Sequence, residues 1–309
     1  LVAALLAAAL LSVTVLHVQL AHFWTSDPYL TFFSLAALWA MVGAHQSEEA
    51  RNGSSQGGTN VPTLAASTTR VPYRRFGYLL AGAAFVGLAI GSKFTAVLLL
   101  APLLWTIWAG GRGRWLVGAL AVATAVAVFV LTNPFAILDN TCPAPAEPPA
   151  LGPWQVPESF TRNCYLRNVT EQNGMVSGAS DLGFTRQYAG TWPYLYFVEM
   201  QLRWGMGPLL GLLAFGGLEW ALWRIVASLR GMGPGNWLDR LRADPLVILM
   251  LWVVPYFVVT GSFYVKFMRY MQPIAPLLVL FGAAALWQVR HVRARRAIAA
   301  LVLGTTALY

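Results

Sequence analysis

The chain has 309 residues, of which 57% are hydrophobic and 11% are charged, and its formal net charge is +9. A soluble domain carries about 25% charged residues, so this composition excludes an ordinary soluble protein and favours a polytopic helical membrane protein. The apolar runs are continuous rather than alternating, which argues against a membrane β-barrel. In a membrane protein, the excess of arginine indicates cytoplasmic loops that face anionic lipid, and no nucleic-acid partner is expected.

Apolar segments follow one another along the whole chain. A helix needs roughly 20 apolar residues to cross a bilayer. The segments cover residues 1–20, 30–45, 76–92, 94–109, 115–132, 206–224, 245–261, 272–288 and 297–309. We divide the fourth from the third at the sequence GSKF, because one helix rising 1.5 Å per residue would overshoot a hydrocarbon core of about 30 Å. The sequence therefore predicts an all-α bundle of about nine transmembrane spans in a single domain, residues 1–309.

The loops between these segments set the orientation. Alternating them across the membrane puts most of the basic residues on one side, which the positive-inside rule identifies as cytoplasmic. Residues 46–75 lie on this side and are rich in Gly, Ser and Thr, which predicts a flexible loop without chemistry. The largest polar segment, residues 133–205, forms an outer-side loop region with a Pro-rich extended part and an aromatic interfacial segment. We expect a multi-pass protein of the bacterial inner membrane.

The two cysteines, Cys142 and Cys164, both fall within this outer-side region. The outer compartment permits a disulfide between them without requiring one. They are too few for a disulfide scaffold, and their spacing matches no metal site.

The first candidate site residue is Asp27, in a short outer loop, with His22 five residues before it. A carboxylate held beside the membrane is costly unless it has a task or a partner. The alternative is that Asp27 caps the following helix, because Pro28 suits the first helical position. The two roles are compatible, since a capping carboxylate can also face a site.

Three cations on the outer side are candidates for binding an anion. Lys93 interrupts an apolar stretch, where it either snorkels to the interface or offers a point charge to a phosphate. Lys266 and Arg269 are three residues apart, which predicts a shared helix face with Tyr264 and Tyr270 beside it. Two cations on one face suit a phosphate or a diphosphate, and contact with lipid headgroups is the alternative.

Asp139 follows a helix that Pro134 is expected to end. It is either a second carboxylate near the site or a solvated loop residue, and we favour the loop. The sequence contains no P-loop, GxSxG or HExxH pattern, so no motif supports a nucleotide-dependent or hydrolytic mechanism.

Several motifs together resemble a known superfamily. In chain order they are HFWTSDPYLTFF, YLLAGAAFVGLAIGSKFTAVLLLAPLL, NPFAILD, TRQYAGTWPYLY with LRWGMGPLLGLLAFGGL, and KFMRYMQPIAPLLVLFGAAAL. Taken together, they resemble the integral-membrane glycosyltransferases of the GT-C fold, in the dolichyl-phosphate-mannose protein O-mannosyltransferase-like superfamily. The resemblance covers most of residues 15–290, and it specifies neither the donor sugar nor the acceptor.

The resemblance implies a hexosyltransferase, mannosyltransferase-like, whose donor is a polyprenyl-phosphate sugar. A hydroxyl of a protein, lipid or glycan acceptor attacks the anomeric carbon on the outer face, and lipid phosphate leaves. Asp27 then matches an acidic residue close to the reaction centre, and Lys93, Lys266 and Arg269 hold the lipid phosphate. Fixed cations stabilise the leaving phosphate most strongly in the transition state. A carboxylate can bind a divalent metal or position the acceptor, and such a cation is the one cofactor we consider.

One departure from the superfamily affects the expected activity. Its members carry a further acidic residue in the first outer loop, before the helix that opens this chain, and no matching segment is present. Either the protein is longer, or this form lacks its main catalytic carboxylate and is inactive alone. Two other functions stay open, a transporter or flippase of a lipid-linked sugar and a non-catalytic subunit of a membrane complex. A transporter would place polar residues deep within discontinuous helices.

Overall fold

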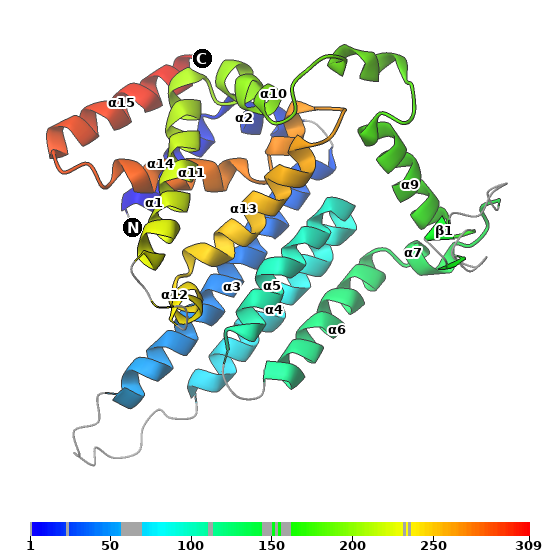
Figure 1. The fold of residues 1–309 in the computed structure, drawn as a ribbon, viewed down its shortest axis with the longest axis horizontal. Helices are drawn as coiled ribbons and strands as arrows, with labels where there is room; N and C mark the ends of the chain where they lie inside the picture. Colours follow the sequence, from blue (N-terminus) through cyan, green and yellow to red (C-terminus); the bar gives the residue numbers. More distant parts are fainter. Residues whose placement is uncertain are drawn as a thin grey trace.

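The computed structural model describes residues 2–22, 25–56, 70–110, 114–143, 150–151, 154–155, 162–230, 233 and 236–309. Within these ranges the regular structure is almost entirely helical, which confirms the predicted all-α class (Figure 1). The exception is an antiparallel pair of two-residue strands, β1 (Ala150–Leu151) and β2 (Trp154–Gln155).

The helices have the following bounds. In the first half of the chain they are α1 (Val2–Ser12), α2 (Val15–His22), α3 (Ser26–Gln56), α4 (Arg70–Ser92), η1 (Phe94–Leu99), α5 (Leu100–Trp108), α6 (Arg114–Thr132) and α7 (Phe135–Leu138). In the second half they are α9 (Cys164–Ser177), η2 (Gly183–Tyr188), α10 (Leu195–Met200), η3 (Gln201–Gly205), α11 (Pro208–Leu229), α12 (Trp237–Ala243), α13 (Leu246–Gly261), η4 (Met268–Met271), α14 (Ala275–Leu286) and α15 (Val292–Leu308). Of the shorter elements, η1, η2 and η4 are 3₁₀-helices and η3 is a π-helix.

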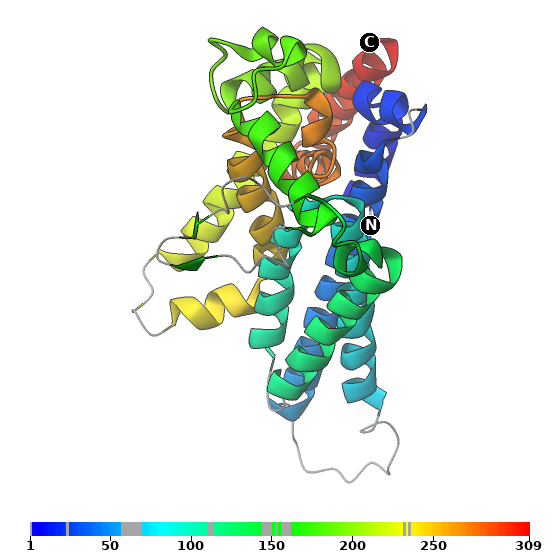
Figure 2. The ribbon, with the colours of Figure 1, turned by 90° about the vertical axis from the view of Figure 1, so that its right-hand side faces the viewer.

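The longer helices pack in two groups. In the first group, α3, α4, α5 and α6 run alongside one another, and α13 packs against α5 and α3 (Figure 1). In the second group, α14 lies across α11 and contacts α1, while α15 contacts both α11 and α1 (Figures 1 and 2). Buried side chains from both groups form one hydrophobic cluster, in which Trp252, Tyr256, Phe281 and Phe197 are the largest fully buried residues. The two groups therefore share a core.

Three of the described helices are long and apolar enough to cross a membrane: α4 from Arg74, α6 and α11. Two bent pairs, α1 with α2 at 58° and α12 with α13 at 93°, bring the number to five if each pair counts as one span. The structure does not show the nine spans that we predicted. Length accounts for two of the missing spans, because the apolar helices Phe94–Trp108 and Ala275–Leu286 are too short on their own. By length and composition, the described helices are compatible with a membrane protein.

Two breaks between helices bear on the predicted segments. The predicted break at GSKF is confirmed, since α4 ends at Ser92 and Lys93 has an extended backbone (φ −160°, ψ 129°) before η1 begins. The predicted helix over residues 1–20 is instead two helices, α1 and α2, bent by 58° relative to each other. There, the Thr14 hydroxyl donates to the Leu10 carbonyl oxygen at 2.8 Å, a local bond that is associated with bent helices.

The predicted loop over residues 46–75 is partly wrong. Helix α3 continues to Gln56, and α4 already begins at Arg70. The stretch QSEEAR, residues 46–51, contains no Gly or Pro and several good helix formers, so nothing ends the helix there. Residues 57–69 of the predicted loop lie outside the described residues.

Helices α11 and α14 cross closely at two glycines. A Cβ atom on Gly217 would overlap the backbone of Phe281 and Gly282, so a residue without a side chain is needed at this crossing. An added Cβ on the neighbouring Gly216 meets nothing within 4 Å. We expect Gly217→Ala to lower the free energy of unfolding by about 1–3 kcal/mol through overpacking. Gly216→Ala should leave it unchanged or raise it by less than about 1 kcal/mol.

Thermal unfolding of both variants in one detergent measures this difference. The two substitutions add the same methyl group at adjacent positions of one helix, so Gly216→Ala controls for helix propensity. Equal midpoints for the two variants would contradict the close crossing of α11 and α14.

Candidate functional site

Asp27 forms the centre of a buried ion-pair cluster. Its side chain is 3% exposed, and it lies in the first turn of α3. Lys93 Nζ donates a hydrogen bond to Asp27 Oδ1 at 2.7 Å, and Arg269 Nε lies 3.7 Å from Asp27 Oδ2. A carboxylate this deeply buried needs opposite charge beside it. The cluster therefore joins three elements that are distant in the sequence: the start of α3, the end of α4 and η4.

The local backbone explains how the three side chains meet. Helix α3 begins at Ser26, so Asp27 lies inside the first turn, where a negative charge is favourable near the positive end of the helix dipole. The described hydrogen bond of its carboxylate goes to Lys93, so the side chain faces the site. The second cation, Arg269, lies in the 3₁₀ turn η4. Phe267, which precedes this turn, has an extended backbone (ψ 130°).

Each of the two cations lies close to the face of an aromatic ring. Lys93 Nζ lies 4.4 Å from the centroid of the Tyr270 ring, and the Arg269 guanidinium lies 4.5 Å from that of Phe267. Burial lowers the pKa of the Lys93 ammonium, and its contact with Asp27 opposes that shift. Burial raises the pKa of the Tyr270 phenol to about 12, so this hydroxyl stays a neutral donor at physiological pH.

The cluster carries one negative and two positive groups. Its surplus positive charge is accessible, since the side chains of Lys93 and Arg269 are 23% and 42% exposed while that of Asp27 is buried. The exposed parts of the two cations can therefore contact one further anion.

Lys266 has different partners from the other two predicted cations. Its Nζ donates to Thr191 Oγ1 at 3.0 Å and to the Tyr264 carbonyl oxygen at 3.1 Å, and burial lowers its pKa. The prediction that Lys266 and Arg269 share a helix face is wrong. Residues 262–267 are not helical, so a spacing of three residues does not place the two side chains together. Of the three predicted cations, the structure brings Lys93 and Arg269 together around the carboxylate.

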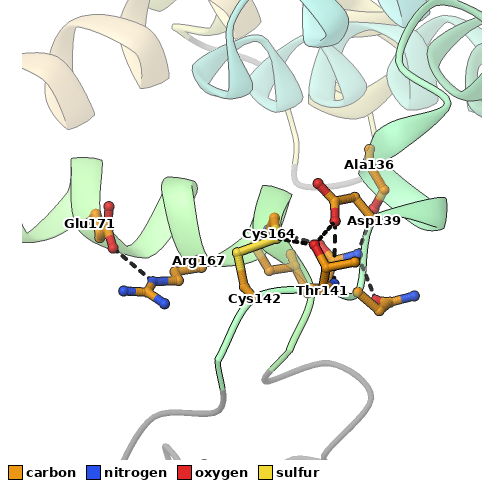
Figure 3. Close-up of a disulfide and its surroundings, with 10 residues drawn as sticks. Ala136, Asp139, Thr141, Cys142, Cys164, Arg167 and Glu171 are labelled. Atoms are coloured by element: carbon orange, nitrogen blue, oxygen red, sulfur yellow. Dashed lines mark hydrogen bonds and ion pairs between the residues drawn. A yellow bond between two sulfur atoms is a disulfide. The ribbon is translucent and has the colours of Figure 1, made fainter.

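The remaining predicted site residues make local contacts. His22 Nδ1 lies 2.7 Å from the Val18 carbonyl oxygen, and the residue is exposed. Asp139 ends α7, and its Oδ1 accepts a hydrogen bond from Thr141 Oγ1 at 2.7 Å (Figure 3). The contacts described for Asp139 agree with the loop interpretation. Tyr264 packs against the C-terminal end of α9, where its ring lies next to Gly178.

A disulfide fixes the N-terminal end of α9. Cys142, after α7, is bonded to Cys164, the first residue of α9 (Figure 3). Asn163 caps the helix by accepting from the backbone N–H of Leu166 at 2.9 Å, and its amide donates to the Ala136 carbonyl oxygen at 3.1 Å. These bonds attach α9 to α7. At the other end of α9, the carbonyl oxygen of residue 176 accepts from the backbone N–H groups of residues 264 and 265, at 2.9 and 3.2 Å.

A cavity of about 780 Å³ lies beside the ion-pair cluster, bounded by α9, the end of α4, η1 and α13. Lys93 and Tyr270 belong to its wall, which links it to the cluster. Several apolar side chains form part of the wall: Ile90, Phe94, Val97, Leu98, Val259 and Phe263. Polar side chains of α9 form another part. Sequence reasoning missed α9, although Asn163 before it and Gly178 after it are typical helix boundaries.

A metal at Asp27 stays a prediction. Among the residues that the structure describes, no three His, Cys, Asp or Glu side chains gather as metal ligands would. Asp27 offers one carboxylate, and both of its oxygens face cations.

The chemistry available to the site follows from its charges and its walls. Two cations with a surplus positive charge can hold a phosphate group. The apolar wall of the adjoining cavity can accept a hydrocarbon chain. Known proteins add no family to this picture, since no protein-family model, no curated protein and no solved structure matches the chain.

Proposed function

We propose that this chain is a multi-pass membrane glycosyltransferase of the GT-C type. It moves a hexose from a polyprenyl-phosphate donor to a hydroxyl acceptor on the outer face of the bacterial inner membrane. The observation that carries the proposal is the cluster of Asp27, Lys93 and Arg269 at the edge of a cavity with an apolar wall. The resemblance supports it, because three of its five segments contain these residues. In this proposal the two shorter apolar helices, together with α3 and α15, extend the five candidate spans to a bundle of about nine.

The charge of the cluster suits this donor. A sugar joined to a lipid through one phosphate is a phosphodiester with a single negative charge, which the surplus positive charge of the cluster can neutralise. When the bond from the anomeric carbon to the phosphate oxygen breaks, the lipid phosphate becomes a monoester with a charge of about −1.5 to −2 at pH 7. Lys93 and Arg269 then stabilise more charge in the transition state than in the bound donor, which is the requirement for catalysis.

Asp27 has a positioning role in this proposal. Its buried carboxylate contacts both cations and holds them in place before the donor arrives. Such preorganisation matters because groups that are already oriented need no rearrangement when charge develops. A direct contact between Asp27 and the acceptor remains a separate proposal, to be tested by the rate of transfer to acceptors of different acidity.

Lipid binding by the purified protein tests the proposed function. In lipid nanodiscs, we expect polyprenyl phosphate to bind at least tenfold more tightly than neutral polyprenol of the same length, because Lys93 and Arg269 recognise the phosphate. Mass spectrometry of released lipid then follows transfer from polyprenyl-phosphate mannose and polyprenyl-phosphate glucose to a membrane extract that supplies acceptors. Equal binding of the phosphate and the alcohol would contradict the proposal.

One observation favours a second function, the movement of a lipid-linked sugar across the bilayer. The chain is discontinuous at the site, where Lys93 has an extended backbone between the end of α4 and the start of η1. Transporters often place their binding sites at such interruptions. In proteoliposomes, movement of the intact donor lipid between leaflets, without release of its sugar, would favour this function over transfer.

A further inference from the structure

One face of α9 presents amide side chains to the cavity. Seven described residues of α9 line the cavity. Six of them, at positions 165, 168, 169, 172, 173 and 176, repeat every three or four residues and therefore lie on one helix face, and Thr170 lies outside this repeat. Three of the six are amides: Asn168, Gln172 and Asn173. A helix that only closed an apolar cavity would present apolar residues on that face. All three residues are exposed, so their amides can meet a polar ligand in the cavity.

The polar part of the wall is almost uncharged. Among the described residues that line the cavity, Lys93 is the only charged one. The others that can form hydrogen bonds are the α9 amides and hydroxyl groups that include those of Ser26, Thr95, Thr260 and Tyr270. Amides and hydroxyls both donate and accept hydrogen bonds. A ligand with several neutral hydroxyl groups, such as a hexose, matches this wall better than a charged peptide or a nucleotide does.

We propose that the cavity face of α9, with Asn168, Gln172 and Asn173, binds the hexose ring of the donor. This inference rests on the proposed function. If a lipid phosphate is bound at Lys93, its sugar is one covalent bond away, and Lys93 lines the same cavity as the three amides. The cavity volume of about 780 Å³ falls within the usual range of small-molecule sites. The apolar wall on η1 and α13 is left for the first part of the lipid chain.

The attachments of α9 support a binding role for it. The helix is fixed at its first residue by the disulfide to Cys142 and at residue 176 by two backbone hydrogen bonds from residues 264 and 265. With both ends attached, the backbone of α9 keeps the three amides at a defined place on the wall that also contains Lys93. Fixed polar groups of this kind discriminate between ligands by the hydrogen bonds that each ligand can complete.

The double variant Asn168→Ala/Asn173→Ala tests this inference. We expect it to bind polyprenyl-phosphate hexose about 30-fold more weakly than the unchanged protein. Each lost hydrogen bond weakens the affinity roughly fivefold, and the two losses together weaken it slightly more than their product. Binding of bare polyprenyl phosphate should change less than twofold, because its phosphate is held by Lys93 and Arg269. Alanine favours a helix, so the fold of α9 should persist. Dissociation constants are measured in nanodiscs with mannose-bearing and glucose-bearing lipids.

Glu171→Ala is the matched control. Glu171 lies in α9 outside the cavity-lining set and pairs with Arg167 through a 2.9 Å contact between exposed side chains. We expect it to leave the affinity for both lipids unchanged. Gln172→Ala is a second cavity variant, which should weaken the hexose-bearing lipid selectively if the double variant does not fold.

The outcomes separate the two proposals. If the unchanged protein prefers polyprenyl phosphate to polyprenol but the amide variants bind both lipids normally, the hexose site on α9 is overturned and the proposed function stands. Equal weakening of both lipids also overturns the hexose site, because the amides would then act on the lipid or on the fold. Lack of any preference for polyprenyl phosphate over polyprenol in the unchanged protein overturns the proposed function itself.

Discussion

Lys93→Met and Arg269→Met are each expected to reduce sugar transfer about 10²–10³-fold, because each removes one fixed cation from the leaving phosphate. Methionine retains an apolar side chain of similar length, so the wall beside the cavity stays filled. Lys266→Met should reduce transfer less than about tenfold. Its ammonium group is bonded to Thr191 and to the Tyr264 carbonyl oxygen rather than to the carboxylate of Asp27. Initial rates of polyprenyl phosphate release, at several donor concentrations, give kcat/KM for the three variants.

Lys266→Met is the control that separates loss of a cation at the cluster from a general loss of positive charge. All three substitutions remove one positive charge, so a general effect of charge on donor binding would lower all three rates equally. A loss in Lys266→Met as large as that in Lys93→Met would contradict a site built on two cations. Full transfer by both Lys93→Met and Arg269→Met would contradict the proposed role of the cluster.

Helix positions could be predicted well where hydrophobic length alone decides them. The apolar run 115–132 matches α6 (Arg114–Thr132), and the run 245–261 matches α13 (Leu246–Gly261). The polar helix α9 was missed, because its sequence has no apolar run and it is attached through a disulfide and through bonds to distant backbone groups. Such attachments depend on the folded chain and leave no periodic pattern in the sequence.

The candidate site shows the same division between composition and geometry. Asp27, Lys93 and Arg269 could be selected from the sequence, since charged side chains within apolar surroundings need a partner or a task. Their mutual arrangement could not be predicted, because it depends on backbone conformation at single residues. An extended backbone at Phe267 is enough to separate Lys266 from Arg269, although the two are only three residues apart. Spacing arguments hold within a helix and fail at such a position.

Asp27→Asn is expected to lower the free energy of unfolding by about 3 kcal/mol and to reduce transfer at least about 100-fold. The amide keeps the shape of the side chain and removes its charge, so Lys93 is left partly buried beside Arg269 without a counter-charge. The double variant Asp27→Asn/Lys93→Met removes the uncompensated ammonium as well. We expect it to recover at least half of the lost stability and none of the lost transfer, because the phosphate has then lost one of its two cations.

The pH dependence of Asp27→Asn gives an independent check on this ion pair. Burial and Arg269 lower the pKa of Lys93, and Asp27 is the group that raises it. In the variant the folded-state pKa therefore falls further below the ordinary value of 10.5. Between the folded-state pKa of Lys93 and the ordinary value of 10.5, the unfolded chain binds more protons than the folded one. The stability of the variant therefore rises with pH in this range. Thermal unfolding between pH 7 and about 9.5 should show that the stability deficit of Asp27→Asn, relative to the unchanged protein, shrinks as pH rises. A constant deficit would show that Lys93 does not depend on Asp27. A double variant as unstable as Asp27→Asn alone would show the same.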